Sequence, residues 1–456
     1  MDFDAAIIGC GPGGLEAAKI LAKAGKRIAV IEAGNAGGTC LNRGCVPTKM
    51  YLAAVAPINA FARLSRQKEL NGELKVNFAG LRKRVARYTG ASSRAVVAEL
   101  ENLGVKLIHG QGKISAPGRL QAIDREDNES SLTYASLIIA SGSVPAIPPA
   151  LAADHKVALT SDDLLNLDYI PESLLVIGSG AIGLEFASFF ASCGVKITIV
   201  EAAPRLAPTE DEDISEELRK ALVKRGYQIF LSATAKSLRS DGDMAVLELA
   251  DGTRLEAEKA LVAVGRRGTG EEVNAVAAGC RVDARGFIKV DENLRSGENV
   301  FAIGDCNGKT LLAHAAATQG RYAALRILGR IDAAYEAGPI PSCVYGNPEI
   351  MRAGLTAREG EQVGTAEASI FQLAANPIAQ AHADPGGFVK AVWLNGRLAG
   401  IAAIGGGVST MVTAAEAFVA GNYTPEKLDR FMIAHPSLDE SLAAAIRAER
   451  HRVGRS

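Results

Sequence analysis

The chain has 456 residues, with 50 Lys plus Arg against 51 Asp plus Glu and no long block of one sign, so nucleic acid is not an expected partner. Its seven cysteines do not form a secreted disulfide framework, no stretch approaches the about 20 consecutive apolar residues of a membrane span, and the N-terminus does not resemble a signal peptide. We therefore expect several domains and a soluble, cytoplasmic protein in a reducing compartment.

The N-terminal segment predicts a dinucleotide-binding βαβ unit. A short apolar strand runs into Gly-x-Gly-x-x-Gly at Gly9, Gly11 and Gly14, a helical pattern follows, and a second strand ends at Glu32. The first glycine permits a tight turn, the second lets the backbone approach a pyrophosphate, and the third lets the helix pack on the strand. The helix N-terminus favours phosphates, and the acidic residue can accept hydrogen bonds from ribose hydroxyls.

The next segment, GGTCLNRGCVPTK at residues 37–49, contains Cys40 and Cys45. In a regular α-helix a five-residue step advances about 7.5 Å, which exceeds the Cα separation of a disulfide. We therefore expect the segment to bend or to enter its helix partway, with Gly44 and Pro47 causing the distortion. A redox pair, two unrelated buried thiols, or half of a metal site all fit; no second Cys or His pair at zinc spacing lies nearby, so no metal is predicted.

The βαβ pattern occurs a second time, with Gly178, Gly180 and Gly183 followed by Glu201. A single glycine motif is weak evidence, but two copies in register, each with its acidic residue 18 positions after the third glycine, predict two dinucleotides and electron transfer between them. Glu201 would repel the 2′-phosphate of NADP, and no cation follows at Ala202 or Ala203, so NAD is the expected nicotinamide cofactor.

The C-terminal third predicts a mixed domain. Residues 327–339 are typical of a helix end and a connection. Residues 387–405 alternate around Asn395-Gly396 like a β-hairpin, and residues 410–421 read as a helix closed by Gly421. Near the end of the sequence, His435 and Glu440 lie five residues apart, a spacing that occurs by chance in many proteins. Beside a redox-active cysteine pair, however, the histidine would supply a base and the glutamate a carboxylate that orients it.

Taken together, these segments resemble the flavin-linked pyridine nucleotide-disulfide oxidoreductases, the family of dihydrolipoamide dehydrogenase, glutathione reductase and mercuric reductase. Residues 37–49 resemble the family's active-site segment, residues 300–316 its second FAD motif, and residues 432–440 its C-terminal catalytic motif. LIIASGSVP and LVAVGRRG resemble the segments that leave and close the nucleotide domains, so the likeness covers the whole chain.

The resemblance implies an α/β fold with two Rossmann-like dinucleotide-binding domains and a C-terminal α+β dimerisation domain. We expect an FAD-binding domain at residues 1–145, an NAD-binding domain at 146–268, a return to the FAD-binding domain at 269–336, and an interface domain at 337–456.

The resemblance also implies roles for individual residues. Cys40 would be the interchange thiol and Cys45 the thiol facing the flavin, while Lys49 and Glu185 would pair near the reactive edge of the isoalloxazine; for Glu185, ordinary surface charge is the other interpretation. His435 and Glu440 would act from the partner subunit, so a homodimer is implied. Predicted FAD contacts are Gly9, Gly11, Gly14, Glu32, Thr39, Lys49, Gly112, Ser141, Gly142, Asp305 (at the ribityl chain) and Ala313; predicted NAD contacts are Gly178, Gly180, Gly183, Glu201 and Gly265.

Within the family, the sequence most resembles dihydrolipoamide dehydrogenase. No cysteine follows Cys343, unlike in mercuric reductases and large thioredoxin reductases, and Glu201 argues against glutathione reductases, which prefer NADP. The predicted reaction is oxidation of dihydrolipoamide by NAD, with a lipoyl domain of a 2-oxo acid dehydrogenase complex as a candidate partner. Several positions depart from the family pattern: Ser437, Asp439, Ser141, and Gly268 after Arg266-Arg267.

Two alternatives remain at this point. One is an NADH-dependent flavoprotein that reduces another disulfide. The other is a non-catalytic subunit that binds FAD and NAD, although such a subunit has no need of Cys40, Cys45, Lys49, His435 and Glu440 together.

Overall fold

The computed structural model describes residues 1–124 and 126–453, which form two compact units. The first unit consists of Met1–Thr48, Arg82–Ala146 and Gly265–Glu336. The second consists of Lys49–Leu81, Ile147–Val264 and Ala337–Ser456. Two helices, α3 (Cys45–Arg66) and α4 (Phe78–Asn102), cross the boundaries between these segments.

The first unit is built on a largely parallel sheet. Its strands are β1 (Phe3–Ile8), β2 (Ile28–Glu32), β3 (Lys106–Ala116), β4 (Arg119–Asp124), β5 (Glu129–Ile139), β16 (Arg295–Gly297) and β17 (Val300–Ala302). Strand β1 lies between β2 and β5, and β2–β3 and β5–β17 are also parallel pairs. The long strands β3 and β5 continue into an antiparallel layer with β4. A short antiparallel pair, β6 (Ser143–Pro145) and β15 (Arg266–Gly268), lies where the chain leaves and re-enters this unit.

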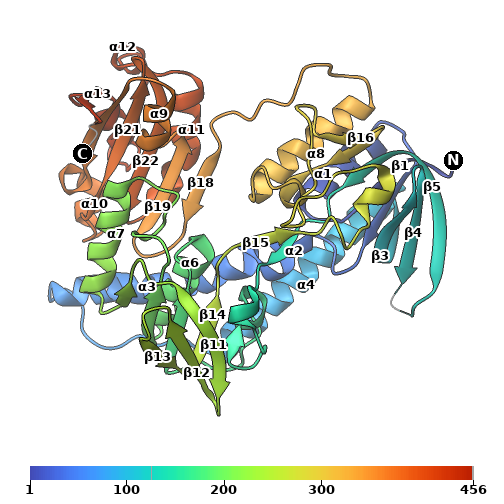
Figure 1. Ribbon diagram of the computed structural model, residues 1–456. Coiled ribbons are helices and arrows are strands. Elements are labelled where there is room, and N and C mark those ends of the chain that lie inside the picture. The colour runs from blue at the N-terminus through green and yellow to red at the C-terminus, as the bar shows by residue number, and fades with distance from the viewer. Residues whose placement is uncertain (125, 454–456) are drawn as a thin grey trace. The chain divides into compact units, whose positions relative to one another are not determined.

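Both faces of the parallel sheet are covered. Ala5 and Ile7 of β1 belong to a core with α1 (Pro12–Lys23), α4 and α8 (Ala313–Ile327). Ala6 and Ile8, which point to the other face, belong to a core with the antiparallel layer. This alternation places the end of β1, and the turn after it, inside a rigid three-layer framework. Figure 1 shows α1 and α8 side by side against the sheet.

The second unit contains a second parallel sheet, in the order β10-β9-β8-β14-β7. Its elements are β7 (Ala158–Leu159), α5 (Ser161–Leu164), β8 (Ser173–Ile177), α6 (Ala181–Ser192), β9 (Lys196–Val200), α7 (Glu212–Lys224), β10 (Gln228–Phe230) and β14 (Lys259–Val262). The antiparallel strands β11 (Ala235–Asp241), β12 (Met244–Leu249) and β13 (Arg254–Ala257) share a hydrophobic core with it.

The C-terminal part of the second unit contains a six-stranded antiparallel sheet, in the order β18-β19-β22-β21-β20-β23, together with helices. It comprises β18 (Pro341–Val344), β19 (Glu349–Gly354), α9 (Ala357–Val363), β20 (Ala366–Gln372), α10 (Pro377–Ala381), β21 (Gly387–Leu394), β22 (Arg397–Gly405), α11 (Val412–Ala420), α12 (Pro425–Leu428), α13 (Glu440–Arg447) and β23 (His451–Arg452). The core of this sheet surrounds the fully buried Trp393. The predicted hairpin is confirmed as β21 and β22, and the predicted helix as α11, which ends at Ala420 with Gly421 as its C-cap.

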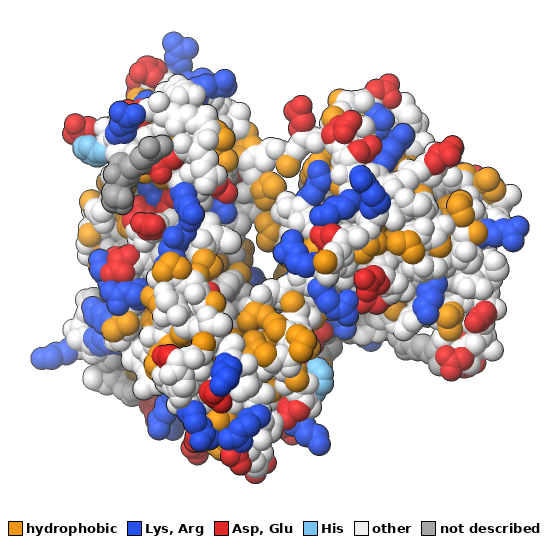
Figure 2. Space-filling view, in the orientation of Figure 1, with side chains coloured by type: hydrophobic (Ala, Val, Ile, Leu, Met, Phe, Trp, Pro, Cys, Tyr) orange, Lys and Arg blue, Asp and Glu red, His pale blue; other side chains and the backbone are white. Residues whose placement is uncertain are grey.

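The predicted α/β fold with two Rossmann-like units and a C-terminal α+β region is confirmed. On the face shown in Figure 2, positive and negative side chains are interspersed. Among the helices that the structure describes, none is long and apolar enough to cross a membrane.

Candidate active site

The first glycine-rich turn connects β1 to α1 in the first unit. Gly9 has φ +100°, and a Cβ there would overlap the carbonyl oxygen of Ala140. A Cβ on Gly14 would overlap the carbonyl oxygen of Gly9, so the first and third glycines pack against each other. A Cβ on Gly11 would have Gly38 Cα as its nearest neighbour, at 4.0 Å. The middle glycine therefore leaves open space above the start of α1, where the pyrophosphate of FAD would fit.

The second turn, between β8 and α6, repeats this geometry in the second unit. Gly178 also has φ +100°, and a Cβ on Gly183 would overlap the Gly178 carbonyl oxygen. A Cβ on Gly180 would meet no atom within 4 Å. The second turn therefore has the same cradle, which fits the pyrophosphate of NAD.

The two strand-end carboxylates hold these turns in place. Glu32 accepts hydrogen bonds from the main-chain N–H of Cys10 at 2.6 Å and of Gly34 at 2.7 Å. Glu201 accepts the equivalent bonds from the main-chain N–H of Ser179 at 2.8 Å and of Ala203 at 2.8 Å. Ser179 Oγ donates a third hydrogen bond to it at 2.7 Å. Both glutamates are buried. They support the glycine turns through hydrogen bonds that the sequence did not indicate, and carboxylate lone pairs remain for ribose hydroxyls.

Asp305, predicted at the flavin's ribityl chain, follows β17 and is held by two polar residues that the sequence did not single out for this role. Ser143 Oγ donates to Asp305 Oδ2 at 2.6 Å, and Arg266 Nε donates to Ser143 Oγ at 2.6 Å. Arg266 also lies 3.8 Å from the Asp305 carboxylate. The aspartate is thus fixed by the short strands β6 and β15, which come from distant parts of the sequence.

The other predicted nucleotide contacts lie in turns or near element ends, except Gly112, which lies within β3. Ser141, where the family has threonine, accepts a 2.8 Å hydrogen bond from Thr269 Oγ1, so the departure keeps a polar contact. Gly142 and Gly265 have positive φ and open space at the Cβ position. Thr39 lies in α2 (Gly38–Arg43), Ala313 begins α8, and Gly112 in β3 packs against the side chains of Ile8 and Ile31.

The cysteine segment is divided between two helices. Helix α2 ends at Arg43, Gly44 has φ −141° and ψ −117°, and α3 begins at Cys45. The predicted interruption at Gly44 is confirmed. The predicted distortion at Pro47 is wrong, because Pro47 lies in the first turn of α3, where its missing N–H costs no helical hydrogen bond. Cys40 is half-buried and Cys45 is exposed.

One turn along α3, Lys49 forms an ion pair with a residue of α6. Its Nζ lies 2.7 Å from both carboxylate oxygens of Glu185, whose side chain is only 7% exposed. The ring contact between Tyr51 and Phe189, with centroids 5.1 Å apart, packs α3 onto α6 and brings the pair together. Because Glu185 is buried and paired, it is not an ordinary surface charge.

Tyr345, which the sequence did not indicate, contacts both members of this pair. Its main-chain N–H donates to Glu185 Oε1 at 3.1 Å, and Lys49 Nζ lies 4.4 Å from the centre of its ring. Burial raises the pKa of Tyr345 to about 12 and that of the neighbouring Cys343 thiol to about 11, so both stay protonated at neutral pH. The pair is therefore fixed to the end of β18 by a main-chain hydrogen bond and a cation–π contact.

His435 and Glu440 also meet in the structure. Their Nδ1 and Oε1 atoms are 2.9 Å apart, and the second carboxylate oxygen accepts the main-chain N–H of Ser437 at 2.9 Å. This N–H and the imidazole lower the pKa of Glu440. The His435 side chain is 71% exposed in the single chain, so it is accessible to another molecule. Asn376, fully buried and missed by the sequence, fixes the turn by donating to the Ser437 carbonyl at 2.9 Å.

Two Rossmann units, a cysteine pair at a helix break and a C-terminal His–Glu pair define a flavin-dependent disulfide oxidoreductase. Residues 3–320 match the family model of the pyridine nucleotide-disulphide oxidoreductases, and residues 340–446 match the dimerisation domain of that family. The chain therefore belongs to the pyridine nucleotide-disulphide oxidoreductase family. Its cofactors are FAD and NAD, and the dimerisation domain supports the predicted homodimer.

Individual relatives agree over nearly the full length. The chain is 35% identical to the dihydrolipoyl dehydrogenase of Chlorobaculum parvum, covering 97% of this chain and 96% of that protein. The crystal structure of LpdA from Mycobacterium tuberculosis has a TM-score of 0.89 at 27% identity, covering 97% of this chain and 99% of that one. The HOCl-induced flavoprotein disulfide reductase RclA from Escherichia coli has a TM-score of 0.86 at 27% identity, with coverage of 97% and 99%.

Proposed function

We propose that this oxidoreductase oxidises dihydrolipoamide with NAD, giving lipoamide, NADH and a proton. We choose this substrate because the chain is similar over nearly its full length to proteins named dihydrolipoyl dehydrogenase. The His435–Glu440 pair supports it, because oxidation of a neutral dithiol needs a base and this imidazole has a carboxylate to orient it.

The chemistry assigned to the cysteines is a thiol–disulfide exchange that starts from a Cys40–Cys45 disulfide. His435 of one subunit takes a proton from the substrate dithiol, and the resulting thiolate attacks Cys40, forming a mixed disulfide and releasing Cys45 as a thiolate. The second substrate sulfur, deprotonated in turn, closes the lipoamide disulfide and releases Cys40. When bound, FAD would accept the two electrons now held by the cysteines and pass them to NAD.

The nucleotide contacts form part of the same proposal. Gly9, Gly11 and Gly14 with Glu32 and Asp305 would hold FAD, aided by Thr39, Gly112, Ser141, Gly142 and Ala313. Gly178, Gly180 and Gly183 with Glu201 and Gly265 would hold NAD. The Lys49 ammonium, fixed by Glu185 and Tyr345, would place a positive charge beside the flavin. The division into domains at residues 145, 268 and 336 and a cytoplasmic location are also proposed.

A second candidate is NADH-dependent reduction of a different disulfide. The similarity to a flavoprotein disulfide reductase favours it, as do Ser437 and Asp439 beside the catalytic pair, where the family pattern differs. Steady-state assays of the holoenzyme should separate the two. We expect NAD-linked oxidation of dihydrolipoamide, and faster oxidation of a dihydrolipoyl domain if a 2-oxo acid dehydrogenase complex is the partner. NADH-linked reduction of glutathione disulfide or another disulfide without lipoamide turnover would favour the second candidate.

A further inference from the structure

The loop that follows Glu201 returns to the second glycine turn. This loop, residues 202–211, connects β9 to α7. Ala207 N–H donates to the carbonyl oxygen of Ser179 at 3.2 Å, and Glu210 N–H donates to the Ala207 carbonyl at 2.9 Å. Ala207 has φ +44°, which is an unfavourable conformation for alanine. Contacts elsewhere must therefore stabilise the loop in this form.

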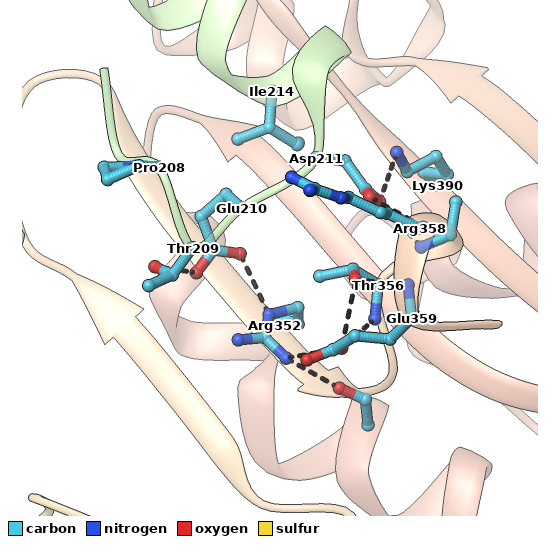
Figure 3. A network of polar contacts seen from close by, with 12 residues as sticks. Pro208, Thr209, Glu210, Asp211, Ile214, Arg352, Thr356, Arg358, Glu359 and Lys390 are labelled. Carbon is cyan, nitrogen blue, oxygen red and sulfur yellow. Dashed lines mark hydrogen bonds and ion pairs between the residues drawn. The ribbon is translucent and has the colours of Figure 1, made fainter. Parts of the chain in front are cut away.

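The C-terminal sheet supplies those contacts (Figure 3). Lys390 of β21, only 2% exposed, has its Nζ 2.6 Å from Asp211 Oδ2 and 2.6 Å from Asp213 Oδ1. Arg352 of β19 donates from Nε to Glu210 Oε2 at 2.9 Å, and its side chain is 18% exposed. Both cations thus hold the end of the 202–211 loop from within the second unit.

Asp211 and Arg352 each have further partners in this network. Asp211 accepts the main-chain N–H of Ala357, the first residue of α9, at 3.0 Å. Arg352 also donates from Nη1 to the Gly354 carbonyl at 2.8 Å and lies 3.8 Å from Glu359. In a site this buried, removal of one charge leaves its partner desolvated and unpaired, so the loop would have to move or hydrate.

We propose that Lys390 and Arg352 are positioning residues for NAD, an inference that rests on the proposed binding of NAD at the second glycine turn. Their ion pairs fix Glu210 and Asp211, which places Ala207 against Ser179 and holds the turn between Gly178 and Gly180 ready for the pyrophosphate. If the loop is released, the Ser179 carbonyl loses the hydrogen bond from Ala207 N–H. The loop must then be ordered when the nucleotide binds, which lowers the affinity.

The test measures the dissociation constant of NADH on the FAD-loaded enzyme for R352M and K390M, with E210Q as a milder change from the loop side. We expect NADH binding to weaken about tenfold, equivalent to about 1.4 kcal/mol. FAD content, and the long-wavelength absorbance band produced by dithiol reduction, should stay as in wild type. R352K, which keeps the charge, should recover part of the affinity.

D384N is the matched control. It breaks a half-buried ion pair, Arg63–Asp384 at 3.2 Å, which joins the C-terminal region to α3 without touching the 202–211 loop. NADH affinity within twofold of wild type in R352M and E210Q, or an equal loss in D384N, would overturn the inference. A wild-type enzyme that binds FAD but no NADH would instead refute the proposed NAD site on which the inference rests.

Discussion

The Nδ1 atom of His435 lies 2.9 Å from Oε1 of Glu440, and Oε2 of the same carboxylate accepts the Ser437 main-chain N–H. Both oxygens are thereby used to fix one imidazole orientation. Nε2 has no partner among residues 1–124 and 126–453, so it is the nitrogen available to a substrate thiol.

Glu440→Gln should reduce lipoamide-linked kcat about 100-fold, because the neutral amide no longer stabilises or orients the imidazolium that forms during proton transfer. NADH-to-dye electron transfer, which needs no thiol deprotonation, should be unchanged. Since the pKa of Glu440 is lowered, the carboxylate's contribution is present above its ordinary pKa and is lost only as pH falls. Across neutral pH, where Glu440 is ionised, the variant should therefore remain slower than wild type; a wild-type to variant ratio that approaches one there would contradict this role.

Gly180→Ala should separate nucleotide binding from folding. A Cβ at this position meets no protein atom within 4 Å, so Tm should match wild type, while the methyl group occupies the space expected for the pyrophosphate and weakens NADH binding at least about tenfold. Calorimetric titration with NADH and a thermal melt provide the two readings. Gly386→Ala, also in open space, is the control. Unaltered NADH affinity in the Gly180 variant would remove the second glycine turn from the NAD site.

Alkylation should discriminate among the cysteines. Burial raises the pKa of Cys10 and Cys193 to about 11 and of Cys306 to about 12, so at neutral pH fewer than about one thiol in a thousand is ionised at each. Iodoacetamide added to the reduced native protein should therefore modify Cys40 and Cys45 first, as read by peptide mass spectrometry. Labelling of Cys10, Cys193 and Cys306 as fast as that of Cys40 and Cys45 in folded protein would contradict the raised pKa of these three thiols.

Ser143→Ala should weaken FAD binding about tenfold. Asp305 loses the 2.6 Å hydrogen bond from the Ser143 hydroxyl, and with that hydroxyl it loses the hydrogen-bonded connection to Arg266 Nε. Fluorescence of released flavin during dialysis measures the loss. Ser130→Ala, which removes a hydroxyl that donates to the Ala122 carbonyl at 3.4 Å, should retain flavin as wild type does. Identical flavin retention in both variants would show that the Ser143–Asp305 contact does not matter for the cofactor.

The sequence predicted what local geometry determines. The glycine turns and the helix break at Gly44 depend on steric limits within a few residues, so the pattern alone indicated them. Tyr345, Ser143 and Lys390 were not assigned a role in the site, because their contacts join positions that are 160, 162 and 177 residues apart. Tyrosine, serine and lysine at such positions carry no local signal, and only the folded chain brings them to the site.

We propose that electrons pass from a dithiol through Cys40 and Cys45 to FAD and then to NAD. Anaerobic addition of one equivalent of dihydrolipoamide to the FAD-loaded enzyme, followed by NAD, tests it most directly. We expect a long-wavelength thiolate–flavin absorbance band that decays on addition of NAD, with formation of one equivalent of NADH, and we expect no such band in Cys45→Ser. Absence of the band and of NADH in the wild type, or equal NADH formation by Cys45→Ser, would contradict it.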